Sequence, residues 1–231
     1  MEIQGRVVLV TGGAGGIGRA LCQMFATEGA RAVVVADTDR EAGLELSKEI
    51  KGFFVPCNPT QEADVQMFVE ASMAQTGRVD IFCSCSNAQL GVGLEASNKQ
   101  WQGSWESNVM AHVYAARAVL PHMLERKEGY WLQAMAVPGA SPVATADSVA
   151  SYAGLAFASW LAAKYRDQGI RVSAFCAGGL SKTGLKVEFA ASNADAITPD
   201  TVAADVIRAV KAEKFLTVPK PQKTRQTSAG R

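Results

Sequence analysis

The chain has few of the residues that build metal centres or disulfide frameworks. It holds five cysteines and two histidines in 231 residues, and its one close cysteine pair, Cys83 and Cys85, has no second pair to match it. A structural zinc site needs four such ligands, so no metal is expected. An odd number of cysteines, scattered through apolar stretches, indicates reduced thiols rather than disulfides.

Long apolar runs and an excess of one charge are also missing. No apolar run reaches the roughly 18 residues that cross a bilayer, and Met1–Arg6 lacks the features of a signal peptide. Residues 1–210 carry 17 Lys/Arg against 21 Asp/Glu, which argues against a nucleic-acid partner. The sequence therefore predicts a cytoplasmic protein with no membrane partner. Residues 220–231 are expected to form a basic, disordered tail.

Strand-length apolar runs alternate with amphipathic stretches of helical length over residues 1–219, without a linker or repeat. This order predicts one α/β domain of the Rossmann type, a doubly wound, seven-stranded parallel sheet with helices on both faces. The expected strands are 6–10, 32–36, 53–55, 79–83, 130–133, 172–176 and 215–218. The expected helices are 17–28, 39–50, 61–76, 104–127, 146–167 and 199–212. Residues 178–198 have no clear strand and are interpreted as a lid or substrate loop.

A glycine-rich segment, Thr11–Gly18, lies between the first strand and the first helix. Gly12 permits a tight turn, Gly16 lets the backbone approach a pyrophosphate, and Gly18 allows the helix to pack on the strand. The phosphates would lie at the helix N-terminus, where free N–H groups and the helix dipole favour anions. The segment predicts a dinucleotide site.

A carboxylate, Asp37, ends the second strand 19 residues after Gly18. At this place a carboxylate accepts hydrogen bonds from the adenosine ribose and repels a 2′-phosphate. Arg40 lies close by and could contact such a phosphate. We expect NAD rather than NADP as the cofactor.

These motifs resemble those of the short-chain dehydrogenase/reductase family over nearly the whole chain. Thr11–Gly18 is similar to its T-G-x-x-x-G-x-G motif, and Trp101–Met123 is similar to its fourth helix. The resemblance implies an adenine contact at Asn58, Asn87 in the motif after the fourth strand, and at Asn108 a residue that supports a proton-relay water. The implied cofactor residues are Gly12, Gly15, Gly16, Ile17, Gly18, Asp37, Asn58 and Asn87.

The catalytic residues of that family are not found in this sequence. Its members need a Tyr with a Lys four residues later, because a phenol with a pKa near 10 is a poor base unless a cation stabilises its anion. No Tyr here has a Lys at that spacing: Tyr114, Tyr130, Tyr152 and Tyr165 are followed by Ala118, Ala134, Ala156 and Gly169. The family's Ser motif is matched by Gln133–Ala136, which has no hydroxyl.

Two registers of the helix at 146–167 place different residues at the reacting end. Alignment without gaps puts Asp147 at the Tyr position and Ser151 at the Lys position. Taking Tyr152 as the family Tyr shortens the helix by five residues and rotates its apolar face by about 140°. We favour the gapless register and keep Asn108, Asp147 and Tyr152 as catalytic candidates, with His112 and Lys182 as further polar groups nearby.

Two functions follow from this pattern. The first is an NAD(H)-binding protein with little or no ordinary dehydrogenase activity, acting as a pseudoenzyme or as a binding or regulatory subunit. The second is an enzyme in which Asp147 or Tyr152 replaces the acid/base group, for redox or non-redox chemistry on a small hydroxyl or carbonyl substrate.

The helices at 104–127 and 146–167 form the oligomer interface in the family, so we expect a homodimer or homotetramer. The helix at 146–167 is also rich in Ala, Leu, Phe and Trp, so it should be buried on several sides.

Overall fold

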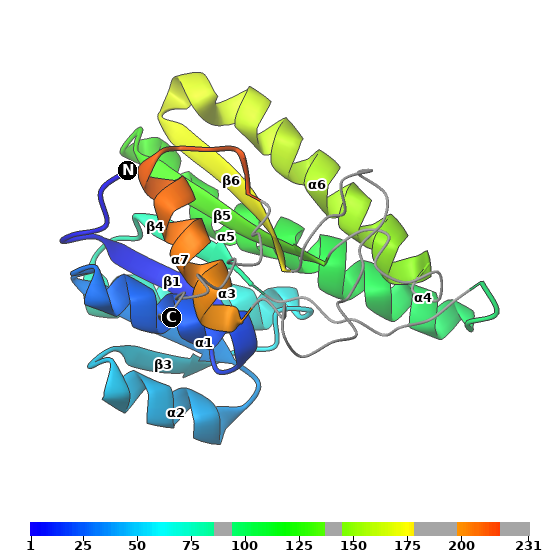
Figure 1. Ribbon diagram of the computed structural model, residues 1–231, viewed down its shortest axis with the longest axis horizontal. Helices are drawn as coiled ribbons and strands as arrows, with labels where there is room; N and C mark the ends of the chain where they lie inside the picture. The colour runs from blue at the N-terminus through cyan, green and yellow to red at the C-terminus, as the bar shows by residue number, and fades with distance from the viewer. Residues whose placement is uncertain (86–93, 137–144, 178–197, 218–231) are drawn as a thin grey trace, which may run out of the picture.

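A parallel β-sheet with helices on both faces forms the centre of the computed structural model (Figure 1). The structure describes residues 1–85, 94–136, 145–177 and 198–217. Within these residues the sheet has seven strands in the order β3-β2-β1-β4-β5-β6-β7, and each pairing is parallel. The strands are β1 (Val7–Thr11), β2 (Ala32–Asp37), β3 (Phe53–Pro56), β4 (Ile81–Ser84), β5 (Gly129–Ala136), β6 (Ile170–Ala177) and β7 (Leu216–Thr217). The predicted doubly wound sheet is confirmed.

The continuous apolar runs of the strands arise because both faces of the sheet are covered. In β1, Val7 and Leu9 enter one core cluster, and Val8 and Val10 enter the other. The first cluster lies under α3 (Glu62–Thr76), α5 (Ala111–Glu125) and α6 (Thr145–Tyr165). The second lies under α1 (Gly16–Thr27), α2 (Arg40–Glu49) and α7 (Pro199–Lys211).

The helix predicted over 104–127 begins earlier and is not uniform. Its first part is α4 (Asn98–Trp105), which starts at a capping box where Ser97 and Gln100 satisfy each other's backbone N–H groups. A π-helical turn, η1 (Glu106–Met110), joins α4 to α5. The predicted start at residue 104 is therefore wrong, although the Ser97-Asn98-Lys99-Gln100 spacing carried the signal for the true start.

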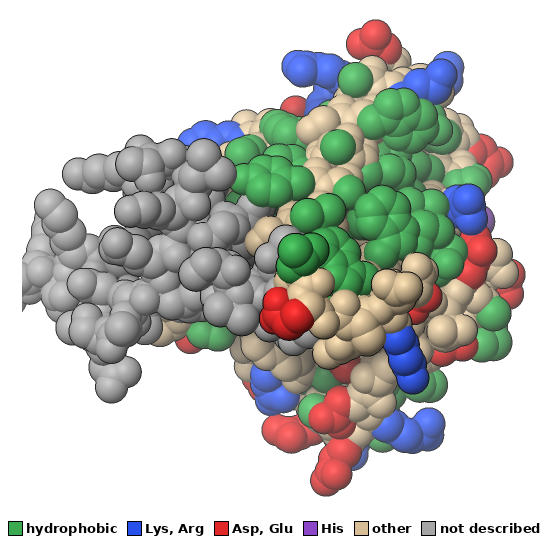
Figure 2. All heavy atoms as spheres, turned by 90° about the vertical axis from the view of Figure 1, so that its right-hand side faces the viewer, with side chains coloured by type: hydrophobic (Ala, Val, Ile, Leu, Met, Phe, Trp, Pro, Cys, Tyr) green, Lys and Arg blue, Asp and Glu red, His purple; other side chains and the backbone are tan. Residues whose placement is uncertain are grey.

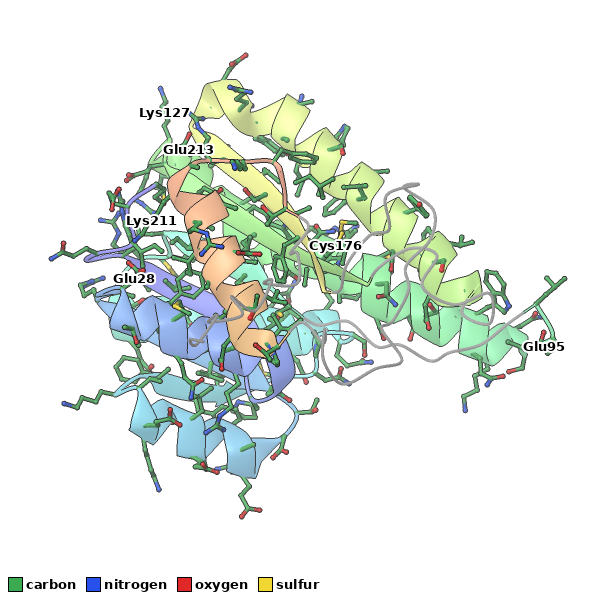
Figure 3. The ribbon with its side chains drawn as sticks, in the orientation of Figure 1. Glu28, Glu95, Lys127, Cys176, Lys211 and Glu213 are labelled. Atoms are coloured by element: carbon green, nitrogen blue, oxygen red, sulfur yellow. The ribbon has the colours of Figure 1, made fainter. Side chains whose placement is uncertain are left out.

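An ion pair joins the end of the last helix to the end of the first. Lys211, in the last turn of α7, donates to Glu28 just after α1 at 2.5 Å, and Figure 3 shows the two side chains side by side. Thr198 caps α7 by accepting from the Thr201 N–H. A single-turn 3₁₀ helix, η2 (Arg166–Gln168), leads into β6.

A fully buried carboxylate, Asp80, fixes the amino ends of the central strands. One of its oxygens accepts from the Val7 N–H at 2.8 Å. The other accepts from Arg78 Nε at 2.9 Å and lies 3.5 Å from Arg6 and 3.7 Å from Arg126. A buried charge is stable only when it is paired and hydrogen-bonded in this way.

Removal of the Asp80 carboxylate leaves guanidinium groups without their buried partner. We expect Asp80→Ala to lower the free energy of unfolding by about 3 kcal/mol, measured by urea denaturation. Glu128→Ala is the control, because Glu128 pairs with Arg6 at 2.8 Å while its side chain is 43% exposed. That change should cost no more than about 1 kcal/mol. Equal costs would contradict this role for Asp80.

Candidate functional site

The glycine-rich segment forms a tight connection between β1 and α1. Gly12 and Gly16 have φ angles of 66° and 51°, in the left-handed region that favours glycine. A Cβ on Gly18 would lie 1.9 Å from the Gly12 carbonyl oxygen, so only glycine lets α1 approach the end of β1 this closely. The roles predicted for Gly12 and Gly18 have this geometric basis.

Open space lies over the start of α1. A Cβ placed on Gly15 or Gly16 would meet no atom of the described residues within 4 Å. No side chain caps α1, no acidic residue lies in its first turn, and half-buried Ile17 packs against the core. The first N–H groups of a helix have no partner within the helix. The cradle therefore presents backbone donors and a positive dipole end to an anion.

Asp37 holds this cradle from the neighbouring strand. Its carboxylate ends β2 and accepts from the Ala14 N–H at 2.9 Å and from the Asp39 N–H at 3.0 Å. A carboxylate has about four acceptor positions, so lone pairs remain for a hydroxyl donor. Arg40, the first residue of α2, is exposed.

Asn58 lies beyond β3 and takes part in a local turn. Its side-chain oxygen accepts from the Thr60 N–H at 3.1 Å and from the Thr60 hydroxyl at 2.9 Å. Its own N–H donates to Asp64 at 3.0 Å. The side-chain oxygen therefore has a structural role, and the Asn58-Pro59-Thr60 sequence, an Asx turn, carried that signal.

Three buried polar residues join α4, the π-helical turn and α6. Asn108 donates from Nδ2 to the Ser104 carbonyl oxygen at 3.0 Å. The Ser104 hydroxyl donates to Asp147 Oδ1 at 2.7 Å. Each of the three is at most 3% exposed. The structure thus brings two predicted residues, Asn108 and Asp147, together through Ser104, which the sequence reasoning missed although it lies one helical turn before Asn108.

The orientation of α6 separates the catalytic candidates. Asp147, Ser151 and Gly154 lie on its buried face, and a Cβ on Gly154 would lie 2.7 Å from the Asn108 carbonyl oxygen. The Ser151 hydroxyl is buried and has no hydrogen-bond partner among the described residues. Tyr152 lies on the outer face and is 47% exposed.

His112 is a buried neutral group in the same region. Its Nδ1 lies 2.7 Å from the Ser84 hydroxyl, and burial lowers the pKa of the imidazole to about 3. A neutral histidine bonded to a strand-end serine suits a structural role better than proton transfer at neutral pH. Asn87 and Lys182 lie outside the described residues, as does the lid predicted over 178–198 except for its last residue, Thr198, which caps α7.

The chain matches known proteins over most of its length. Residues 6–194 fit the family model for short chain dehydrogenase. The chain belongs to the short-chain dehydrogenase family. One relative, the 1-deoxy-11-beta-hydroxypentalenate dehydrogenase of Streptomyces exfoliatus, is 32% identical over 93% of this chain and 83% of its own length. The oxidoreductase UcpA of Salmonella typhimurium is 29% identical over 90% of this chain and 81% of its own length.

Solved structures agree with the family assignment. The crystal structure of gox2181 superposes with a TM-score of 0.78 at 25% identity, covering 91% of this chain and 90% of that one. Short-chain dehydrogenases in general use NAD(P), and this chain is an oxidoreductase-like member of that family.

The described residues fit such a cofactor at one end only. The glycine cradle supplies the open space and backbone donors that a pyrophosphate needs. At the other end, no tyrosine in the chain is followed four residues later by a lysine. The buried face of α6 carries the Asp147 carboxyl and the Ser151 hydroxyl instead.

The described part of the chain holds neither a membrane-spanning helix nor a cluster of metal ligands. No helix there has the length and apolar character that crossing a membrane requires. No group of three or more His, Cys, Asp or Glu side chains there is arranged to hold a metal ion.

Proposed function

We propose that this short-chain dehydrogenase family member binds NAD(H) through its first β-α-β unit. The observation that carries the proposal is the open cradle at Gly15 and Gly16, which lies over the uncapped start of α1. Its N–H groups would hold the pyrophosphate, and Gly12, Ile17 and Gly18 keep the turn and the helix in place. When bound, the nicotinamide supplies the hydride-transfer chemistry.

Asp37 favours NAD over NADP. It is half-buried beside the cradle, with lone pairs left for the hydroxyls of the adenosine ribose. A 2′-phosphate there would face the carboxylate at close range, and the exposed Arg40 offers only partial compensation. Asn58 follows β3, the neighbour of β2, and its side-chain amide N–H groups would contact the adenine. We assign Asn87 to the same site from its position in the family motif.

Titration with NADH and NADPH, followed by nucleotide fluorescence, tests this assignment. The parent should bind NADH at least about tenfold more tightly than NADPH. Asp37→Asn should reduce that ratio, because the amide removes the repulsive charge and keeps an acceptor for the Ala14 N–H. Asp39→Asn is the control, because asparagine also caps α2 and the substitution removes a charge two residues away.

Failure of the parent to bind either nucleotide at millimolar concentration would contradict the dinucleotide site itself. Equal ratios in the parent and in Asp37→Asn would contradict the role of Asp37 only.

We further propose that ordinary hydride transfer on alcohols and carbonyls is weak or absent. In the gapless register, Asp147 occupies the position of the family's tyrosine and Ser151 occupies that of the lysine. Both side chains lie on the buried face of α6. These two positions then supply neither a phenol nor a cation to move the substrate proton. The protein would act as a pseudoenzyme, or as a binding or regulatory subunit that responds to NAD(H).

A specific observation favours a second candidate, an enzyme that uses Asp147 as its acid/base group. The Asp147 carboxyl is buried and one oxygen is held by the Ser104 hydroxyl, beside Asn108. In this candidate the carboxyl exchanges a proton with a small hydroxyl or carbonyl substrate, for redox or non-redox chemistry. Tyr152 is the weaker candidate because its side chain lies on the outer face of α6.

Turnover of a panel of alcohols and ketones with NAD(H) separates the two candidates. The pseudoenzyme proposal expects no turnover by the parent, and a gain of turnover when Asp147→Tyr and Ser151→Lys together restore the phenol and the cation on the buried face. The second candidate expects parental turnover that falls about 100-fold in Asp147→Asn and is unchanged in Tyr152→Phe. Parental turnover that collapses in Tyr152→Phe would contradict both.

We propose that the protein forms a homodimer or homotetramer through α4, α5 and α6. Figure 2 views the side on which α4 and α6 lie, and apolar side chains gather there over a continuous area. Trp105, Val149, Tyr152 and Trp160 are each at least 41% exposed. Trp160 also stacks on Phe157 and meets the edge of Tyr165. A patch of this kind on a single chain indicates a protein interface.

A charge in this patch should disrupt the assembly. We expect the parent to sediment as a dimer or tetramer and Trp160→Lys to shift to the monomer with its fold intact, because the indole is 53% exposed. Leu44→Lys is the control, since Leu44 is 39% exposed on α2, the helix that covers the other face of the sheet. A monomeric parent, or an oligomer unchanged by Trp160→Lys, would contradict the interface.

A further inference from the structure

Three cysteines gather on the α1 side of the sheet. Cys22 of α1 and Cys83 of β4 are fully buried in the same core cluster, and half-buried Cys85, just after β4, packs against it. All three are free thiols. None has a part in the proposed cofactor contacts, so their gathering needs a separate account.

The thiols lie directly beneath the glycine cradle. The Cys85 N–H donates to the carbonyl oxygen of Thr11, the residue before Gly12, at 3.2 Å. A Cβ on Gly13 would lie 3.2 Å from the Cys22 sulfur. A covalent change at Cys85 would therefore be transmitted to the backbone that starts the cradle.

The three thiols differ in access to solvent and in chemistry. Burial raises the pKa of Cys22 and Cys83 well above that of an ordinary thiol and keeps a dissolved oxidant from reaching either sulfur directly. Cys85 is partly open to solvent. Cys83 and Cys85 are two residues apart at the end of β4, so their side chains lie on the same face of the sheet, and both pack in the same core cluster. An accessible thiol beside a resolving thiol is the arrangement of an oxidation-sensitive pair.

We propose that Cys85 and Cys83 form a peroxide-sensitive dithiol whose oxidation weakens dinucleotide binding. In the first step the Cys85 sulfur attacks the peroxide O–O bond and becomes a sulfenic acid, and the peroxide leaves as water or an alcohol. In the second step the Cys83 sulfur displaces hydroxide from that sulfenic acid, giving a disulfide and water. Two thiols are oxidised and one peroxide is reduced. The regulatory part of this proposal rests on the proposed NAD(H) site.

The disulfide would act on the cradle through the backbone of Cys85. A sulfur–sulfur bond is about 2.05 Å long, so the Cys85 side chain must move toward the buried Cys83. That movement draws the Cys85 N–H away from Thr11. The turn at Gly12 would then lose its support from β4, and the pyrophosphate would lose aligned N–H donors.

The test treats the full-length protein with hydrogen peroxide, quenches it and maps its peptides without reduction. We expect a Cys83–Cys85 cross-link with a mass loss of about 2 Da and a dissociation constant for NADH that rises at least about fivefold. Dithiothreitol should reverse both changes. Cys83→Ser and Cys85→Ser should abolish them, and in Cys83→Ser the sulfenic acid should be trapped by dimedone at Cys85. Cys176→Ser is the control and should respond as the parent does, because Cys176 is buried in β6.

Other outcomes overturn the proposal. A cross-link from Cys85 to Cys22, or no cross-link, overturns the assignment of the pair. A Cys83–Cys85 disulfide that leaves NADH affinity unchanged overturns its regulatory role. If the reduced parent does not bind NADH at all, the proposed function fails, while the peptide map still decides whether the dithiol forms.

Discussion

The close approach of α1 to the end of β1 is the constraint on which the rest of the site depends. A Cβ on Gly18 would lie 1.9 Å from the Gly12 carbonyl oxygen, so the helix can start directly over the strand only with glycine there. That position leaves the space over Gly15 and Gly16 open and brings the uncapped N–H groups to the carboxyl edge of the sheet. Asp37 then holds the Ala14 N–H from the neighbouring strand. The proposed dinucleotide binding is a consequence of this packing.

The two ends of the site differ in what they retain. The cradle end has the glycines, the dipole and the carboxylate, each in a geometry that suits a dinucleotide. At the reacting end, the buried face of α6 presents the Asp147 carboxyl, held by Ser104, and the Ser151 hydroxyl. Among the described residues, the buried face of α6 carries neither a phenol nor a cation there. The two ends are built from different elements, the β1–α1 turn with β2 at one end, and α4, the π-helical turn and α6 at the other.

Much of the fold could be predicted from the sequence because its signals are local. Apolar runs such as Val7–Thr11 are continuous, since both sheet faces are covered, and the glycine segment indicates its own turn. The site was less predictable because its geometry depends on which side of a helix faces the core. The sequence favours the register with Asp147 at the tyrosine position but leaves Tyr152 open, and α6 turns Tyr152 outward and Asp147 inward. Ser104 acquires a role only when α4 and α6 pack together, and no local pattern shows that pairing.

Hydrogen exchange of the backbone amides, measured with and without NADH, tests the central claim most directly. If the dinucleotide lies over the start of α1, the amides from Gly12 to Gly18 should exchange more slowly in its presence, and those of α5 and α7 should change far less. Slower exchange confined to other segments, or no change at saturating NADH, would contradict the account.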